Sequence, residues 1–124
     1  MKDLAVQLLE NKQASSSYFL LKFKYPDIVK PGQFFNVKVG WLNDPYLRRP
    51  LSVHDWDKKN KIVTFLYKVV GHGTKVLSRL KTGSTIKVLG PLGNTFDLKG
   101  LTSKSNVALI GGGIGLAPLL FLAK

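Results

Sequence analysis

The feature that most constrains the fold is a series of short segments of β-type pattern, separated by turn-forming residues. In Tyr18–Lys24, the apolar residues Phe19, Leu21 and Phe23 alternate with Leu20, Lys22 and Lys24. Alternation with a period of two is typical of strands that are buried on one face. Strands are predicted in the same way for residues 4–9, 34–39, 49–54, 62–70 and 85–89. Short strands at this spacing predict a mainly β domain, either a barrel or a sandwich.

Turn signals fall between these segments. Pro31-Gly32 and Asn43-Asp44-Pro45 contain the residues that turns favour, and residues 57–61 form a charged hairpin tip. Residues 90–94 are so rich in turn formers that a loop is predicted there. Trp41 is expected to pack at the edge of the barrel and not to stack on a cofactor.

One segment of the first hundred residues has helical spacing. Val76, Leu77 and Leu80 fall on one side of a helix over residues 73–80, and Thr74 is a candidate N-cap. The helix is predicted to end near Gly83.

The pattern changes after Asn106. Residues 107–110 are a continuous apolar run, which is typical of a strand buried on both faces of a parallel sheet. The glycines that follow are Gly111, Gly112, Gly113 and Gly115, and residues 117–123 have the pattern of a helix start. We therefore expect two domains, with a barrel over residues 1–101 and the beginning of a truncated α/β domain over residues 102–124.

Composition excludes several functions. The 124 residues contain no cysteine, so this chain alone carries no disulfide, thiolate metal site or cysteine-ligated iron–sulfur cluster. No apolar run reaches the roughly 18 residues that span a bilayer. The first residues lack the apolar core of a signal peptide. A cytoplasmic protein without membrane attachment is expected.

The net charge of +12 would attract a polyanion, such as a nucleic acid, a phosphorylated cofactor or an acidic protein. The lysines are scattered and lack the arginine and aromatic interleaving of a dedicated nucleic-acid surface. Nucleic acid is therefore disfavoured as a partner. The two histidines, His54 and His72, have no carboxylate at a catalytic spacing, so neither a catalytic residue nor a metal site is predicted.

Two short motifs are candidate phosphate sites. Arg49, Pro50, Leu51 and Ser52 begin a strand, and an arginine fork suits a pyrophosphate because it donates two parallel charged hydrogen bonds. The alternative is a solvated arginine before an edge strand. Gly73-Thr74 opens the short helix, whose N–H groups would face an anion and whose threonine hydroxyl could add a bond. The alternative there is a plain glycine turn with a threonine cap.

Together with three further motifs in order, these residues resemble the ferredoxin-reductase-like flavoproteins. Within that group the chain is most similar to the electron-transfer subunits of NAD-dependent dihydroorotate dehydrogenases. The motifs are Arg49 to Ser52, then Leu66-Tyr67-Lys68, Gly73-Thr74, residues 89–94, and the segment from Gly111 to Pro118. The resemblance covers essentially the whole chain.

The resemblance implies a six-stranded antiparallel Greek-key barrel that binds FAD, followed by a Rossmann-like domain that binds NAD. Arg49 to Ser52 would hold the FAD pyrophosphate and flank the flavin ring, Leu66 to Lys68 would line the ribityl and adenosine side, and Gly73-Thr74 would bind phosphate. The implied partner is the catalytic dihydroorotate dehydrogenase subunit, in a hetero-oligomer that serves pyrimidine biosynthesis. The two-iron two-sulfur cluster of such subunits cannot lie on this chain, because its cysteines are absent.

The glycine-rich loop departs from the strict dinucleotide fingerprint, since Leu116 stands where the third glycine is expected. The loop either wraps part of a pyrophosphate or is only a tight connection between a strand and a helix, so the NAD site is expected to be incomplete. Two other functions stay open from the sequence. One is a flavin reductase subunit of the hydrogenase or glutamate synthase type, and the other is a basic β-barrel that binds RNA.

Overall fold

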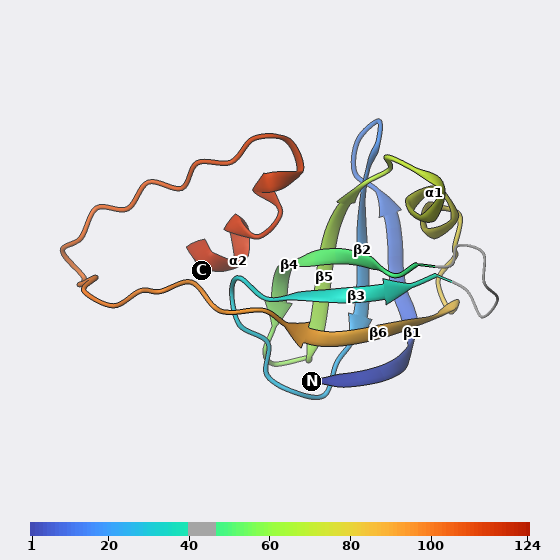
Figure 1. The fold of residues 1–124 in the computed structure, drawn as a ribbon, viewed down its shortest axis with the longest axis horizontal. Helices are drawn as coiled ribbons and strands as arrows, with labels where there is room; N and C mark the ends of the chain where they lie inside the picture. The colour runs from blue at the N-terminus through green and yellow to red at the C-terminus, as the bar shows by residue number, and fades with distance from the viewer. Residues whose placement is uncertain (40–46) are drawn as a thin grey trace.

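The computed structural model describes residues 1–39 and 47–124. The turn predicted at Asn43-Asp44-Pro45 and the packing predicted for Trp41 lie outside these residues. The described chain forms mainly strands (Figure 1), which are β1 (Lys2–Gln13), β2 (Tyr18–Lys24), β3 (Phe34–Lys38), β4 (Arg49–Asp57), β5 (Ile62–Lys68) and β6 (Thr85–Leu92). The helices are α1 (His72–Ser78), the 3-10 turn η1 (Gly113–Leu116) and α2 (Leu119–Ala123).

The six strands close into an antiparallel barrel in the order β1-β2-β5-β4-β3-β6. Strands β3, β4 and β5 are successive neighbours, and β6 returns to lie beside β3, which is the Greek-key arrangement. The predicted fold class of the barrel is therefore confirmed. Because every strand has a neighbour on each side, the barrel leaves no free edge for another strand.

The barrel interior is filled by the alternate residues that the sequence pattern indicated. Phe23, Phe35 and Phe65 are fully buried, and their ring centroids lie 5.3 to 5.9 Å apart. Tyr25 packs edge-on against Phe35 and donates a hydrogen bond to the Gly90 carbonyl at 2.7 Å. This aromatic cluster ties β2, β3 and β5 together.

Several strand ends differ from the prediction. The loop predicted at residues 90–94 begins only at Gly93, because β6 continues through Gly90-Pro91 to Leu92, which pairs with Phe34. The register between β3 and β6 shifts at this point, and a bulge is where proline and glycine fit into a sheet. A Cβ on Gly90 would lie 2.7 Å from Cγ of Phe35, so close packing requires glycine.

Bulges also lengthen β1 and β4 beyond the predicted segments. The register of β1 against β2 shifts between Leu8 and Glu10, after which β1 continues to Gln13. The register of β4 against β5 shifts between Val53 and Asp55, after which β4 continues to Asp57. A bulge breaks the period of two, so each strand was predicted too short. Strand β5 is shorter than predicted and ends at Lys68.

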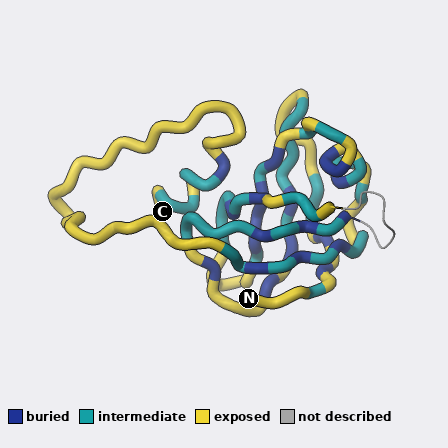
Figure 2. Tube along the Cα trace, in the orientation of Figure 1, coloured by how far each residue is buried: buried dark blue, intermediate teal, exposed yellow. Residues whose placement is uncertain are grey.

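The predicted strand at residues 107–110 is wrong for this structure, in which these residues are irregular and exposed (Figure 2). A parallel strand needs a neighbour for its hydrogen bonds, and the barrel, being closed, has no edge to offer. The helix start predicted after the glycines is present as η1 and α2. Helix α2 packs against β4, and Phe121 contacts the barrel core.

Candidate functional site

The candidate site lies where the beginning of β4 meets the end of β5. These two strands are antiparallel, with Val53 opposite Phe65, so the residues before Val53 meet those after Phe65. Helix α1 follows β5 directly. A cavity of about 260 Å³ opens there, and it brings together most of the predicted barrel residues with one residue of the glycine-rich loop. It is lined by Arg49, Pro50, Leu51, Tyr67, Lys68, Val70, Thr74 and Ile114.

The guanidinium of Arg49 lies over Gly73, so the two predicted phosphate motifs are in contact. A Cβ on Gly73 would lie 3.0 Å from Cζ of Arg49. The only hydrogen bond that Arg49 makes to a described residue is a long one, from Nη1 to the Leu47 carbonyl at 3.4 Å. No carboxylate of the described chain pairs with it. Arg49 therefore lines the cavity with a charge that no described carboxylate pairs with.

The predicted N-cap is wrong, because α1 begins after Gly71 and Thr74 lies in its first turn. The Thr74 hydroxyl accepts hydrogen bonds from the N–H groups of Val70 at 2.9 Å and Gly71 at 3.1 Å. It also donates to the Gly71 carbonyl at 3.2 Å. Thr74 thus fixes the turn before the helix, in the way an N3 residue reaches back to the N-cap. Of the backbone carbonyls that the structure describes outside α1, none accepts from the N–H groups of Gly73 or Thr74.

The residues of the Leu66-Tyr67-Lys68 segment differ in their burial and in their contacts at the cavity. Tyr67 is buried, its ring stacks on Phe19 with centroids 5.7 Å apart, and its hydroxyl donates to Oδ1 of Asn11 at 2.9 Å. Burial raises the pKa of Tyr67 well above its ordinary value, so this hydroxyl stays protonated. Lys68 is exposed, with Nζ 5.7 Å from the centroid of the Tyr18 ring.

Leu66 and Ser52 are half-buried and do not line the cavity. They pair with Leu20 and Phe34 respectively on the neighbouring strands. The structure brings neither of them to the cavity, although each adjoins a residue that lines it.

The glycine-rich loop reaches the cavity through Ile114 alone. Gly111, Gly112, Gly113 and Gly115 are exposed and do not line it. Gly113 has a φ of 54°, a conformation that favours glycine, where η1 begins. A Cβ on Gly111 would lie 2.8 Å from Cδ1 of Leu119, so this glycine permits the loop to fold onto α2.

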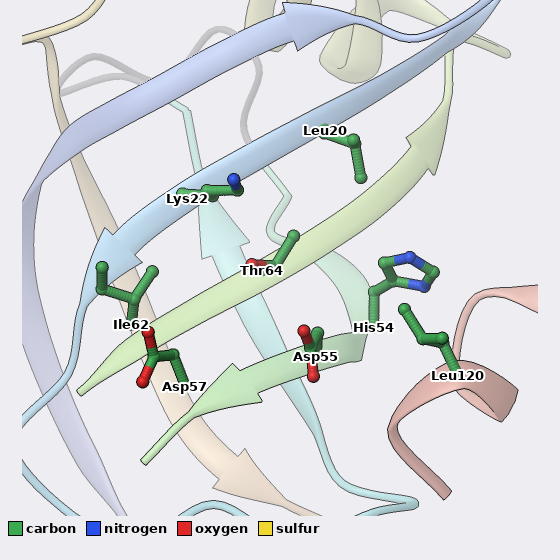
Figure 3. Close-up of a pocket in the computed structure, with 8 residues that line it drawn as sticks. All are labelled: Leu20, Lys22, His54, Asp55, Asp57, Ile62, Thr64 and Leu120. Atoms are coloured by element: carbon green, nitrogen blue, oxygen red, sulfur yellow. The ribbon is translucent and has the colours of Figure 1, made fainter. Parts of the chain in front are cut away.

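A second cavity of about 310 Å³ lies on the outer face of the barrel, beside helix α2 (Figure 3). Lys22, Asp55, Asp57 and Thr64 point into it from β2, β4 and β5, and Leu120 borders it from α2. His54 lies beside Leu120 at this border. A hydrogen bond from the Asn60 side chain holds the pKa of Asp57 below its ordinary value.

Three residues with a place in this arrangement were not predicted as site residues. Ile114 is a wall of the first cavity, Asn11 holds Tyr67 and the end of α1, and His54 contacts Ala117. Asn11 is some sixty residues from its partners in the sequence, so no local pattern indicates it. In the described chain no three His, Asp or Glu side chains cluster to hold a metal ion, and no helix is long and apolar enough to cross a membrane.

Comparison with known proteins places the chain among flavoproteins. It is 43% identical over 118 residues to the "Dihydroorotate dehydrogenase B (NAD(+)), electron transfer subunit" of Clostridium acetobutylicum, covering 95% of this chain and 46% of that protein. The protein of the same name from Fusobacterium nucleatum is 41% identical over 119 residues, covering 93% of this chain and 46% of its own. The chain thus spans about half the length of these curated relatives.

Among solved structures, the cytochrome P450 reductase GcoB of Amycolatopsis has a similar fold, with a TM-score of 0.81 at 24% identity. The match covers 98% of this chain and 38% of that one. Residues 5–96 match the family described as "Oxidoreductase FAD-binding domain", and this range includes the barrel from Ala5 onward and α1, with every predicted barrel site residue. The chain therefore belongs to the oxidoreductase FAD-binding domain family.

Proposed function

We propose that this chain binds FAD at the cavity between β4, β5 and α1, as the flavin-carrying part of an electron-transfer subunit of an NAD-dependent dihydroorotate dehydrogenase. The observation that carries the site is the Arg49 guanidinium, which lies over Gly73 without a carboxylate partner among the described residues. An arginine fork beside a glycine and the N–H groups of a first helical turn suits a pyrophosphate.

The residues fit part of a dinucleotide. Small-molecule sites commonly measure roughly 300–1,000 Å³, so a cavity of about 260 Å³ takes in a portion of FAD. Arg49 and the N–H groups of Gly73 and Thr74 would hold the two phosphates. Pro50, Leu51 and Ile114 would exclude water from the apolar part, and Ser52 and Leu66 would contact the remainder along the outer face.

When bound, FAD supplies the capacity to accept and release electrons, and the protein orients the ring and sets its electrostatic surroundings. The positive charge of Arg49 would favour the dianionic pyrophosphate. In the complete arrangement, electrons would pass from a catalytic dihydroorotate dehydrogenase subunit to this subunit and then to NAD. The electron-transfer names of the relatives and their 41–43% identity support this assignment.

The same proposal assigns residues 1–101 to the FAD-binding barrel and residues 102–124 to the start of an NAD-binding domain. Gly111, Gly112, Gly113 and Gly115 would face the nicotinamide cofactor there. The two-iron two-sulfur centre that this subunit type implies would need cysteines from outside these 124 residues. A location in the cytoplasm stays a prediction.

Titration of the flavin-free chain with FAD and with FMN tests the site. FAD is expected to bind about tenfold or more tightly, because a second phosphate adds charge-assisted hydrogen bonds that contribute roughly 1.5–3 kcal/mol each. Riboflavin, which has no phosphate, provides the lower limit of the affinity. Equal affinities for FAD and FMN would contradict the pyrophosphate site, and no binding of either would contradict the proposal as a whole.

A further inference from the structure

His54 occupies a bulge in β4. Val53 lies opposite Phe65 and Asp55 lies opposite Thr64, so His54 is the extra residue between them. A bulge redirects a side chain relative to the regular alternation of a strand. The His54 ring lies next to Leu120 of α2, at the border of the second cavity (Figure 3).

The ring makes one short contact with the segment that carries the glycine-rich loop. Nδ1 of His54 lies 2.6 Å from the carbonyl oxygen of Ala117, which joins η1 to α2. A carbonyl only accepts hydrogen bonds, so Nδ1 carries the proton and is the donor. Ala117 is only 2% exposed, so little water competes for this bond.

Ala117 connects the His54 contact to the first cavity through Ile114. Its N–H donates to the carbonyl of Ile114 at 3.0 Å, within the turn of η1. Ile114 is the residue of the loop that lines the cavity with Arg49 and Thr74. A continuous series of contacts therefore runs from the β4 bulge through His54 and Ala117 to one wall of the cavity.

Few other polar contacts hold this segment to the barrel. Residues 93–116 are exposed throughout, and a single backbone hydrogen bond joins this stretch to the described part of the barrel, from the Phe96 N–H to the Pro31 carbonyl at 3.4 Å. Lys124 and Asp55 form an ion pair at 2.7 Å, but its lysine is 58% exposed, and exposed ion pairs contribute little. Phe121 adds apolar packing. His54 thus makes the one shielded polar contact between the described barrel and this segment.

We infer that His54 is a positioning residue, which holds the glycine-rich loop on the barrel and thereby sets Ile114 as a wall of the cavity. The inference rests on the proposed function where it concerns FAD. His54 acts through Ala117 and touches no flavin atom in this scheme. Its effect on the cofactor is to close one side of the site.

Two variants separate the position of the donor from the mere presence of a polar side chain. In His54→Asn the amide nitrogen stands about where Nδ1 stands, whereas in His54→Gln the amide lies one bond farther along the side chain. Hydrogen exchange of the backbone amides of Gly115 and Ala117 reports the attachment in the flavin-free chain. FAD titration of the same variants reports the effect on the site, and thermal unfolding confirms that the barrel is intact.

His54→Asn is expected to leave both amide exchange and the Kd of FAD within about twofold of the unsubstituted chain. His54→Gln is expected to speed exchange and raise the Kd about three- to tenfold, as follows from losing one hydrogen bond. Equal exchange in the two variants would overturn the role of Nδ1. Altered exchange in His54→Gln with an unchanged Kd would overturn the role of the loop as a cavity wall. If the unsubstituted chain binds no FAD, the proposed function fails, while the exchange comparison still decides whether His54 holds the loop.

Discussion

Two adjacent arginines before and at the start of β4 carry the same charge in different surroundings. Nη2 of Arg48 donates to both carboxylate oxygens of Asp3, at 2.9 and 3.1 Å, and so ties this strand to β1. Arg49 lies over Gly73 and has no carboxylate partner in the described chain. Arg48 therefore has a structural role, and Arg49 has its charge free for a ligand.

Substitution Arg49→Lys is expected to weaken FAD binding by about 1 to 3 kcal/mol, because lysine keeps the charge but cannot donate two parallel hydrogen bonds. Isothermal titration of the flavin-free protein measures the effect. Arg48→Lys is the matched control, and its Kd for FAD is expected to stay within about twofold. An unchanged Kd in Arg49→Lys would move the pyrophosphate site elsewhere.

The pKa of Tyr67 gives the stability of the fold a dependence on alkaline pH. Burial raises this pKa in the folded state, while the unfolded chain releases the proton near pH 10. The contribution of the protonated Tyr67 to the free energy of unfolding is thus complete below about pH 10. It is lost as the pH rises above that value, at up to about 1.4 kcal/mol per pH unit. Burial, with Asp27 as a smaller cause, raises the pKa of Tyr25 in the same direction.

In Tyr67→Phe, the decline of the unfolding free energy above pH 10 is expected to be shallower. At pH 7 the variant should be less stable by about 1 kcal/mol, since Asn11 loses its hydrogen-bond donor. Urea unfolding at several pH values measures both effects. Tyr25→Phe serves as a comparison, because it leaves Tyr67 in place. A slope identical to that of the unsubstituted protein would show that Tyr67 titrates normally.

At the scale of elements, helix α1 is held at both ends by side chains. Thr74 fixes the turn before it, and Asn11 of β1 secures its end by donating from Nδ2 to the carbonyls of Leu77 at 2.8 Å and Leu80 at 2.9 Å. The last carbonyls of a helix lack the regular partners of its interior. The Leu77 carbonyl also accepts from the Leu80 N–H at 3.1 Å, so Asn11 is a second donor to Leu77 and the donor to Leu80. The Tyr67 hydroxyl orients Asn11. This network fixes α1, and with it Gly73, relative to the barrel.

Substitution Asn11→Ala is expected to lower the free energy of unfolding by about 2 to 3 kcal/mol, because it removes the side-chain partner of the Leu80 carbonyl and of the Tyr67 hydroxyl and one of the two donors to the Leu77 carbonyl. It should also speed amide exchange in α1. Gln13→Ala is the control in the same strand, since Gln13 bonds only the exposed Ser16 carbonyl, and its effect should stay within about 0.5 kcal/mol. Equal losses in the two variants would contradict an anchoring role for Asn11.

At the scale of the whole molecule, the barrel is a closed unit from which residues 93–112 extend as an exposed segment before the chain returns to β4 through α2 (Figure 2). Of the described residues after β6, only Ile114 lines the first cavity. Residues 107–110, which were predicted to start a sheet, form no strand among the described residues. The barrel side of the proposed site thus has its lining residues in place, whereas no sheet of the described residues supports the glycine-rich loop.

We therefore expect the FAD-loaded chain of 124 residues to react slowly with NADH. Hydride transfer needs the nicotinamide held roughly 3 to 3.5 Å from the flavin in an aligned pose, and such positioning supplies about 7 to 11 kcal/mol of the barrier. Anaerobic stopped-flow mixing with NADH measures the rate of flavin bleaching. Reduction by dithionite is the control that the bound flavin can accept electrons. Rapid bleaching that saturates at micromolar NADH would show that a nicotinamide site is present.

Much of the fold and part of the site were readable from local patterns. The alternation in Tyr18–Lys24 predicted that strand with its bounds. The spacing of Val76, Leu77 and Leu80 predicted the start of α1 to within one residue, but the helix ends at Ser78 and not near Gly83. Arg49 and Gly73, predicted as separate phosphate motifs, lie in contact. The predictions of the strand and of the helix succeeded because each of these elements imposes a fixed period on the side chains that face the core.

What the sequence by itself determined is therefore the β class, the order of the strands along the chain and the residue types suited to a pyrophosphate. Only the tertiary structure decided where the strands end, because bulges depend on the neighbouring strand, and that 107–110 stays irregular, because a strand requires a partner. It also decided that Arg48 pairs with Asp3 while Arg49 faces the cavity, and that Asn11 and His54 hold distant segments. Such contacts join residues far apart in the sequence, and no local period encodes which of them meet.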